Sequence, residues 1–291
     1  MEPSSRTGTP PAAESASRAG LPLQAWQAQH ELAVPGSGRG LLAPPPLRAV
    51  LFDLDGTLLD TAPDLIHTAN QLLEEHGQLA LPEGSFGPVV SHGSAAMIQR
   101  GFHIAHDDPR MEALRSRYLD LYHQQVSRLT SPFTGILELL DAIEHRGLRW
   151  GVVTNKPAWL SNPLLRDLGL AERASCIVCG DTVAHRKPHP APVTHACELL
   201  DVAPAEAVLV GDAMRDVTAG QAAGTSTLVA LFGYICAEDE PTRWGANGLL
   251  GHPLELLRWL DRDTVSITDG PLPYLDAGAA PLLSVPGSRT G

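Results

Sequence analysis

Two aspartates, Asp53 and Asp55, come directly after the apolar run at residues 48–52. A run of this length predicts one buried strand of a parallel sheet. Because side chains two positions apart in a strand point to the same side, both carboxylates lie together at the strand's carboxyl end, where open α/β sheets bind ligands. Such a pair is tolerated if a cation neutralises it, or if one member keeps its proton and acts as an acid. Both conditions suit phosphoryl chemistry with Mg²⁺.

Polar residues also follow three later segments of the chain. Thr154 and Asn155 come after a second apolar run, where a hydroxyl and the N–H groups that open a helix can hold phosphate oxygens. Lys187 supplies one positive charge ahead of another predicted helix. Asp212 follows a further buried run, and Asp216 lies one helical turn after it.

Each of these signals has an ordinary structural explanation when taken alone. Aspartate is favoured at helix N-termini, which accounts for Asp212, and a lone lysine such as Lys187 is usually solvated. A helix cap does not account for several acidic strand ends in one sheet. Carboxylates, a hydroxyl and a lysine at one edge predict a site for a hard cation with a phosphate bound on it.

The bulk composition limits the classes of function. The chain has 291 residues, is 43% hydrophobic and carries a formal net charge of −12. This balance predicts a globular protein and argues against a nucleic-acid partner, since binding the phosphate backbone needs clustered lysine and arginine. No apolar run is long enough for a membrane span, and residues 1–20 lack the pattern of a secretory leader. We therefore expect a cytoplasmic protein without a membrane partner.

The four cysteines are too few and too scattered for a disulfide framework. Cys176 and Cys179 have a spacing seen in metal sites, but they fall in a predicted strand, where positions three apart face opposite sides. A second pair of ligands is also missing. We interpret them as buried thiols.

The order of apolar patterns predicts an α/β fold with a doubly wound parallel sheet and an inserted helical cap. Strand-like runs cover residues 48–52, 149–153, 176–179, 208–210 and 227–231, and helical spacing covers 65–73, 95–102 and 111–126. The predicted organisation is a disordered extension at 1–46, a catalytic core at 47–61 and 132–262, a helical cap at 62–131, and a disordered tail at 263–291. The position of the helical block suits a lid over the site, although helices packed on one sheet face are the alternative.

Taken together, the motifs resemble those of the haloacid dehalogenase-like hydrolase superfamily. The matching elements, in order, are residues 53–57, Thr154, Lys187 and residues 211–216. The resemblance spans the expected folded region and implies a Rossmann-like core with a helical cap after the first motif. It also implies a Mg²⁺-dependent enzyme acting on a small phosphorylated metabolite.

The resemblance implies a role for each motif residue. Asp53 would be the nucleophile that forms an aspartyl-phosphate, and Asp55 the acid that protonates the leaving alcohol and then the base that activates water. The presence of this acid argues against dehalogenation. Mg²⁺ would be held by Asp53, the backbone carbonyl of Asp55 and Asp212.

The remaining motif residues would support these groups. Thr154, the Asn155 amide and Lys187 would stabilise charge on the phosphoryl oxygens. Asp216 would orient Lys187 or a water of the metal, and Thr57 would lie behind the metal ligands. The chain departs from the usual pattern at Ala213, where relatives often carry a hydroxyl or acidic side chain, so a hydrogen bond around the metal is expected to be lost.

Within the superfamily, residues 51–65, 152–157 and 187–190 resemble phosphoglycolate phosphatases. Residues 91–94, 234–235, 244–246 and 252–256 resemble a branch that includes N-acetylmuramic acid 6-phosphate phosphatase. Both substrates combine a phosphate monoester with a carboxylate, so a cationic or donor group is expected in the cap. The candidates are His92, Arg100 and His103, with ordinary cap surface as the alternative interpretation.

Two rival functions remain open from the sequence. A phosphomutase would use the same nucleophile and acid, although no cap acid–base set is recognisable. A noncatalytic binding module would keep the fold, but loss of catalysis normally removes one of the leading aspartates, and both are present. We expect a monomer or a homodimer.

Overall fold

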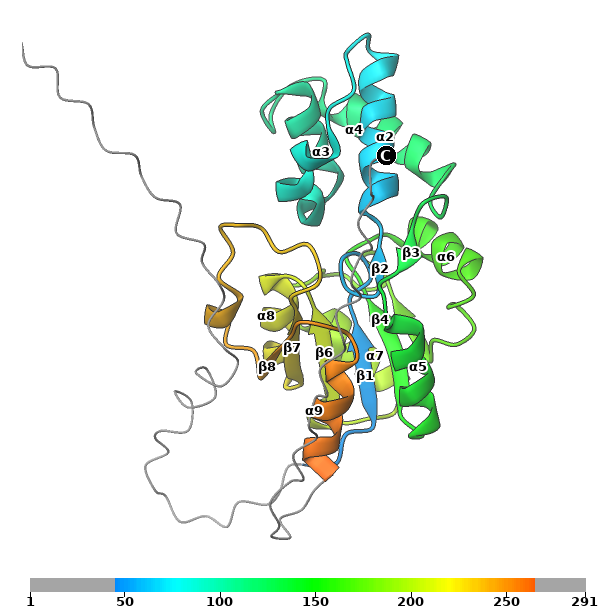
Figure 1. Ribbon diagram of the computed structural model, residues 1–291, viewed down its shortest axis with the longest axis vertical. Coiled ribbons are helices and arrows are strands. Elements are labelled where there is room, and N and C mark those ends of the chain that lie inside the picture. The colour runs from blue at the N-terminus through cyan, green and yellow to red at the C-terminus, as the bar shows by residue number, and fades with distance from the viewer. Residues whose placement is uncertain (1–44, 265–291) are drawn as a thin grey trace, which may run out of the picture. The chain divides into compact units, whose positions relative to one another are not determined.

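The strand that precedes Asp53 lies in the middle of a six-stranded sheet (Figure 1). The structure is a computed structural model that describes residues 45–264. The sheet order is β5-β4-β1-β6-β7-β8, and every neighbouring pair in it is parallel. The strands are β1 (Ala49–Phe52), β4 (Arg149–Val153), β5 (Cys176–Val178), β6 (Ala207–Gly211), β7 (Ser226–Ala230) and β8 (Gly248–Leu250).

The path of the chain through the sheet creates a crevice beside β1. The chain runs from β1 outward to β4 and β5, then returns to the other side of β1 and continues outward through β6, β7 and β8. Ligands bind where the strand order reverses in this way, at the carboxyl ends of the strands. The predicted doubly wound parallel sheet is confirmed, and β8 is one strand more than the sequence pattern indicated.

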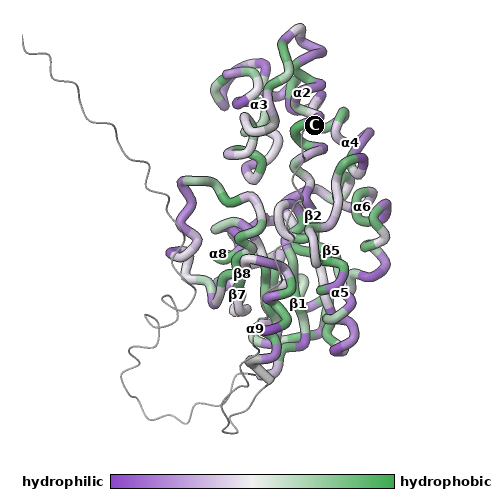
Figure 2. The backbone as a smooth tube through the Cα atoms, in the orientation of Figure 1, coloured by the Kyte–Doolittle hydropathy of each residue, from purple (hydrophilic) through white to green (hydrophobic). Residues whose placement is uncertain are grey.

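Two hydrophobic clusters cover the two faces of the sheet, and Figure 2 shows hydrophobic residues along β1. Val50 and Phe52 belong to one cluster, while Ala49 and Leu51 belong to the other, as the alternation of strand side chains requires. The first face packs on α5 (Ile136–His145), α6 (Ala158–Asp167) and α9 (Glu255–Thr264). The second face packs on α7 (Ala191–Leu199) and α8 (Met214–Ala223).

A set of helices interrupts the chain between β1 and β4. We use the name helical insertion for residues 62–130. It contains α2 (Ala62–Glu75), η1 (Glu83–Ser85), η2 (Gly87–His92), α3 (Gly93–Phe102) and α4 (Met111–His123). The three helices predicted here are confirmed, with α2 beginning earlier than its apolar spacing indicated because Pro63 is well tolerated in a first helical turn.

Two short strands flank the helical insertion. β2 (Leu59–Asp60) pairs antiparallel with β3 (Ser131–Pro132), so the two chain crossings lie side by side. Inside them, the buried carboxylate of Asp64 accepts hydrogen bonds from the backbone N–H groups of Leu129 and Thr130 and from the Thr130 hydroxyl, at 2.7–3.0 Å. These bonds tie the start of α2 to the end of the insertion. The division into separate core and cap domains remains a prediction.

The predicted extensions at 1–46 and 263–291 lie almost wholly outside the described residues. Within 45–264, no helix has both the length and the apolar character that crossing a membrane requires. Two single-turn helices complete this region, η3 (Pro204–Glu206) and η4 (Pro241–Arg243).

Candidate active site

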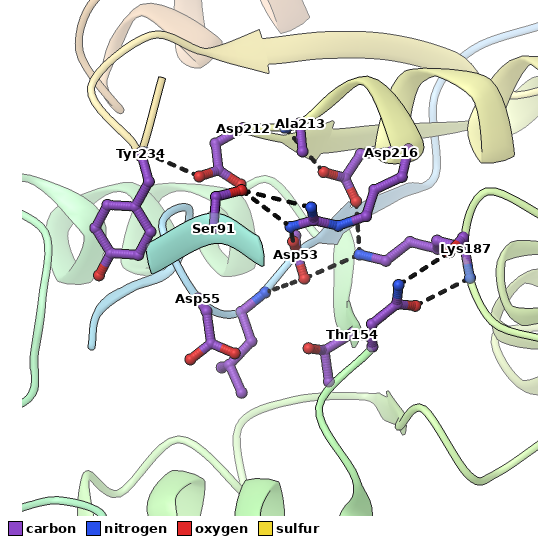
Figure 3. A network of polar contacts seen from close by, with 12 residues as sticks. Asp53, Asp55, Ser91, Thr154, Lys187, Asp212, Ala213, Asp216 and Tyr234 are labelled. Atoms are coloured by element: carbon purple, nitrogen blue, oxygen red, sulfur yellow. Dashed lines mark hydrogen bonds and ion pairs between the residues drawn. The ribbon is translucent and has the colours of Figure 1, made fainter. Parts of the chain in front are cut away.

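Three buried carboxylates meet at the crevice beside β1 (Figure 3). Asp53 follows β1, Asp212 follows β6, and Asp216 lies in the first turn of α8. One oxygen of each lies within 4.8 Å of those of the other two. This is the one such cluster of potential metal ligands found in residues 45–264. The sequence grouped Asp53 with Asp55 and Asp212; the structure brings Asp53 and Asp212 together with Asp216 and leaves Asp55 outside this cluster.

A buried lysine lies between two of the carboxylates. Lys187 Nζ is 2.9 Å from Asp53 Oδ1 and 2.7 Å from Asp216 Oδ1. Burial alone would disfavour its charge, but the two carboxylates outweigh burial and raise the pKa of Lys187. The side chain of Asn155 bonds both the backbone N–H and the carbonyl of Lys187, each at 2.9 Å. Asn155 therefore fixes the segment that carries the lysine.

Of the three clustered carboxylates, Asp212 has the fewest hydrogen-bond and ion-pair partners among the described residues. Its Oδ2 accepts the Tyr234 backbone N–H at 2.9 Å, while its buried Oδ1 has no hydrogen-bond partner among the described residues. Burial and the nearby charges of Asp53 and Asp216 raise the pKa of Asp212 to about 8. An uncompensated acidic oxygen beside two further carboxylates suits a divalent cation with oxygen ligands, such as Mg²⁺.

The backbone approaches this cluster closely at Gly56. Gly56 has a φ of +82°, and a Cβ at this position would overlap the carboxylate of Asp212. Only glycine satisfies both the left-handed conformation and the close approach. The turn after Asp55 therefore depends on this residue.

Asp55 has a different environment from Asp53. Its side chain is about a quarter exposed and accepts a hydrogen bond from Lys156 Nζ at 2.8 Å. The same ammonium donates to the hydroxyl of Tyr122, on α4, at 2.8 Å. Burial and the Asp55 charge hold the pKa of Tyr122 well above its ordinary value, so its hydroxyl stays protonated.

Arg215 connects the carboxylate cluster to the helical insertion. Its guanidinium lies 3.9 Å from Asp53 Oδ2 and donates long hydrogen bonds of 3.4 and 3.5 Å to the hydroxyl of Ser91, in η2. Burial opposes its charge, but Asp216 and Asp53 raise the pKa of Arg215. The guanidinium is therefore charged at neutral pH.

A cavity of about 480 Å³ opens over these groups. Asp53, Asp55, Thr154 and Asn155 line it, as do side chains of the helical insertion. Of the other predicted residues, Thr57 is fully buried and does not line the cavity. Lys187, Asp212 and Asp216 lie next to Asp53 but do not line the cavity either.

The structure corrects two of the three substrate-contact candidates in the helical insertion. His92 lines the cavity. Arg100 points elsewhere, with its Nε donating to the Ser85 carbonyl at 2.9 Å on the exposed side of α3. His103 ends α3 in a left-handed conformation, exposed and away from the cavity. Helical position decides both cases, because only the first turn of α3 faces the site.

Several residues around the site were not predicted from the sequence. Lys156 lies inside the Thr154 motif and Arg215 adjoins Asp216, so proximity to motif residues was a usable signal. Tyr234 lies in the segment 234–235 that carries the branch resemblance. Tyr122 has no such signal, because α4 reaches the site only through tertiary packing. The Ala213 backbone N–H donates to Asp216 Oδ2 at 3.0 Å, so this position orients a carboxylate without any side chain of its own.

Cys176 and Cys179 are the buried thiols that the sequence predicted. Cys176, Cys179 and Cys197 are buried and free. Burial raises the pKa of Cys176 to about 12 and that of Cys197 to about 11, so both are protonated and unreactive.

The chain is similar in sequence to known hydrolases. A sequence profile described as haloacid dehalogenase-like hydrolase matches residues 50–230. The chain is 45% identical over 216 residues to the N-acetylmuramic acid 6-phosphate phosphatase of Pseudomonas aeruginosa, covering 74% of this chain and 96% of that protein. It is 42% identical over 210 residues to the phosphoglycolate phosphatase of Xanthomonas campestris pv. campestris, covering 72% of this chain and 94% of the relative.

Solved structures share the fold. A predicted phosphoglycolate phosphatase from Haemophilus somnus is 22% identical with a TM-score of 0.65, covering 76% of this chain and 99% of that one. CbbY from Rhodobacter sphaeroides, solved in complex with phosphate, is 25% identical with a TM-score of 0.61, covering 74% of this chain and 99% of that one.

Proposed function

Because this chain belongs to the haloacid dehalogenase-like hydrolase family, we propose that it is a Mg²⁺-dependent phosphatase whose substrate is N-acetylmuramic acid 6-phosphate. The chain is a phosphomonoester hydrolase, as its named relatives are. The named relatives divide between this sugar acid phosphate and 2-phosphoglycolate, so the substrate has to be argued from the site.

The size of the cavity above Asp53 favours one of the two substrates. Its volume of about 480 Å³ is in the range of sites that enclose a whole small molecule. Phosphoglycolate has a single methylene between its ester oxygen and its carboxylate, and would leave most of this space empty. A phosphorylated sugar acid fills it, with apolar contacts from Leu65, Val90 and Leu119.

Asp53 is the nucleophile in this proposal. Its Oδ1 is held by the Leu54 backbone N–H at 2.7 Å and by Lys187 at 2.9 Å, which fixes the carboxylate at the floor of the cavity. Attack on phosphorus forms an aspartyl-phosphate and releases the sugar alcohol. Water then hydrolyses this acyl phosphate and regenerates the carboxylate.

Asp55 transfers the protons of both steps. In its acid form it protonates the leaving alcohol oxygen, and as a carboxylate it then takes a proton from the attacking water. Lys156 holds this side chain at 2.8 Å while leaving it partly open to the cavity. The ion pair with Lys156 positions Asp55 and leaves it able to exchange protons with a ligand.

The remaining residues would offset negative charge. Asp53, Asp212 and the backbone carbonyl of Asp55 would hold Mg²⁺, which when bound neutralises the carboxylate cluster and the phosphate. Lys187, the Thr154 hydroxyl and the Asn155 backbone N–H would stabilise the phosphoryl oxygens in the transition state. Asp216 keeps Lys187 charged and in place.

Phosphate release from the purified protein tests this function. The substrates are N-acetylmuramic acid 6-phosphate, 2-phosphoglycolate and glucose 1-phosphate, each with Mg²⁺ and with a chelator. We expect the sugar acid phosphate to have the highest kcat/KM and the chelator to remove activity. A higher kcat/KM for 2-phosphoglycolate would overturn the substrate, and full activity in the chelator would overturn the metal requirement.

The same assay separates hydrolysis from phosphoryl return. A phosphomutase would convert glucose 1-phosphate to an isomer without net phosphate release. The names of the relatives support hydrolysis instead.

A further inference from the structure

Four lysine and arginine side chains line the cavity, and one of them lacks a protein partner. Three reach protein oxygens at the base of the cavity or at its side; they are Lys156, Arg186 and Arg215. Arg115, on α4, makes no side-chain hydrogen bond or ion pair with any residue in the described range 45–264. A partly buried guanidinium that faces a cavity in this state is available for a ligand anion.

Arg115 lies on the same helix as Tyr122, nearer the N-terminus of α4. Arg115, Tyr118 and Tyr122 lie on one face of the helix, and all three line the cavity. Tyr122 contacts Lys156, beside Asp55. Arg115 precedes Tyr122 by two helical turns, about 10 Å of helix rise. The guanidinium therefore belongs to the wall of the cavity away from the reacting phosphate.

We propose that Arg115 binds the carboxylate of the substrate and makes this phosphatase specific for a phosphorylated sugar acid. The inference rests on the proposed function and adds the residue that recognises the second anionic group. A guanidinium and a carboxylate form two parallel charge-assisted hydrogen bonds, so the contact fixes orientation as well as charge.

The charge distribution in the cavity supports this direction of binding. Among residues 45–264, the acidic side chains that line it are Asp53 and Asp55, at the phosphate end. Leu119 lies one turn from Arg115 on α4 and also lines the cavity, as does the first turn of α3 at Gly93 and Ser94, whose N–H groups add positive potential. Within the described part of the chain, the lining therefore presents no carboxylate to an anion beyond Asp53 and Asp55.

The separation between phosphate and carboxylate differs between the two substrates after which the relatives are named. In 2-phosphoglycolate the carboxylate lies one methylene from the ester oxygen, so phosphate bound at Asp53 keeps the carboxylate near the base of the cavity. In N-acetylmuramic acid 6-phosphate the pyranose ring separates the two groups, and the lactyl carboxylate extends toward the far wall. Arg115 is therefore expected to contribute to binding of the longer acid.

The test compares two substrates that differ only in the lactyl ether that carries the carboxylate. N-acetylglucosamine 6-phosphate has a hydroxyl where N-acetylmuramic acid 6-phosphate has its lactyl ether. We expect Arg115→Gln to lower kcat/KM for the muramic acid ester by about 10- to 100-fold, as loss of a hydrogen-bonded charge pair predicts. The same variant should keep kcat/KM for the glucosamine ester within about twofold, because that substrate has no group for Arg115 to bind. For the muramic acid ester, the kcat/KM of Arg115→Lys should fall between that of the unmodified enzyme and that of Arg115→Gln.

Arg128→Gln is the matched control. Arg128 is an exposed arginine of the helical insertion outside the cavity lining, so its loss changes net charge equally and should leave both kcat/KM values unchanged. An equal loss for both substrates, or no loss for either, in Arg115→Gln would overturn the role of Arg115. If the unmodified enzyme shows no preference between the two esters, the proposed substrate fails and the inference fails with it.

Discussion

Asp53 and Asp55 are separated by one residue, yet their surroundings differ. Asp53 is buried between Lys187 and the other two carboxylates, whereas Asp55 is partly exposed and paired with Lys156 and, through it, Tyr122. Neighbouring acids with different environments can take different chemical roles. The structure therefore supports one carboxylate held still for attack and one that exchanges protons with the cavity.

Substitution of each acid should separate these roles. Asp53→Asn removes the nucleophilic oxygen, so we expect turnover to fall by at least about 10³-fold. Asp55→Asn keeps the nucleophile but removes proton transfer, for which a loss of about 10²- to 10⁴-fold is expected. Phosphate release measures both, and circular dichroism checks that each variant is folded. Turnover by Asp53→Asn at the rate of the unmodified enzyme would show that Asp53 is not the nucleophile.

The sequence predicted the residues that follow strands better than those brought in by packing. Asp53, Thr154 and Asp212 were recognisable because a polar side chain at the end of an apolar run has few structural reasons to be there. Arg100 and Arg115 look alike in the sequence, and only the packing of α3 and α4 separates an exposed arginine from one that lines the cavity. Contacts of long cationic side chains are tertiary properties.

At the scale of elements, the site depends on how closely the turn after β1 approaches the end of β6. Gly56 makes this approach possible, because it has a positive φ and no side chain against Asp212. The strands on either side were predictable from hydrophobic runs. β8 was not, because only Leu249 and Leu250 are apolar between Gly248 and Gly251, whereas the equally short β5 consists of three apolar residues.

Gly56→Ala tests this contact, with Gly77→Ala as its control. Both glycines have positive φ, but an added Cβ at Gly77 meets nothing within 4 Å. Gly77→Ala should lower the free energy of unfolding by about 1 kcal/mol, the cost of the backbone conformation alone. Gly56→Ala should cost about 3 kcal/mol or more, since Asp212 must also move, and should weaken Mg²⁺ binding. Chemical denaturation and calorimetry measure the two effects; equal costs for both variants would contradict the close approach.

The bonds around Asp64 make a second prediction for an element. Asp64→Ala leaves the N–H groups of Leu129 and Thr130 and the Thr130 hydroxyl without their acceptor. We expect a loss of about 3 kcal/mol in the free energy of unfolding, because buried donors then lack partners. Asp107→Ala, at an exposed position of the same insertion, should change stability by less than about 0.5 kcal/mol. Urea unfolding compares them, and similar stabilities would show that these bonds do not hold the insertion.

At the scale of the whole molecule, the carboxylate cluster makes stability depend on both pH and Mg²⁺. The pKa of Asp212 is raised to about 8 by burial and by its acidic neighbours, so the metal-free protein holds this proton more tightly than the unfolded chain does. A raised carboxyl pKa means that the contribution of this group to stability declines as the pH rises toward 8. Mg²⁺ has to displace the same proton.

Mg²⁺ affinity should therefore rise with pH. We expect the Kd for Mg²⁺ to fall about tenfold between pH 6 and pH 7 and to level off above about pH 8, with close to one proton released per ion at pH 6. Calorimetry in two buffers of different ionisation enthalpy measures the proton count. A Kd that stays constant from pH 6 to pH 8 would show that Asp212 binds no proton in the metal-free protein.

The pairing of β2 with β3 has a consequence for how this protein can be changed. Both crossings of the helical insertion are set side by side by two residue pairs, Leu59 with Pro132 and Asp60 with Ser131. A replacement segment joins the chain at this one pair of ends, while the parallel sheet and its aspartates keep their own connections. Grafting the equivalent helices of a relative between residues 60 and 131 should therefore exchange substrate preference as a unit, leaving the hydrolytic chemistry with the recipient.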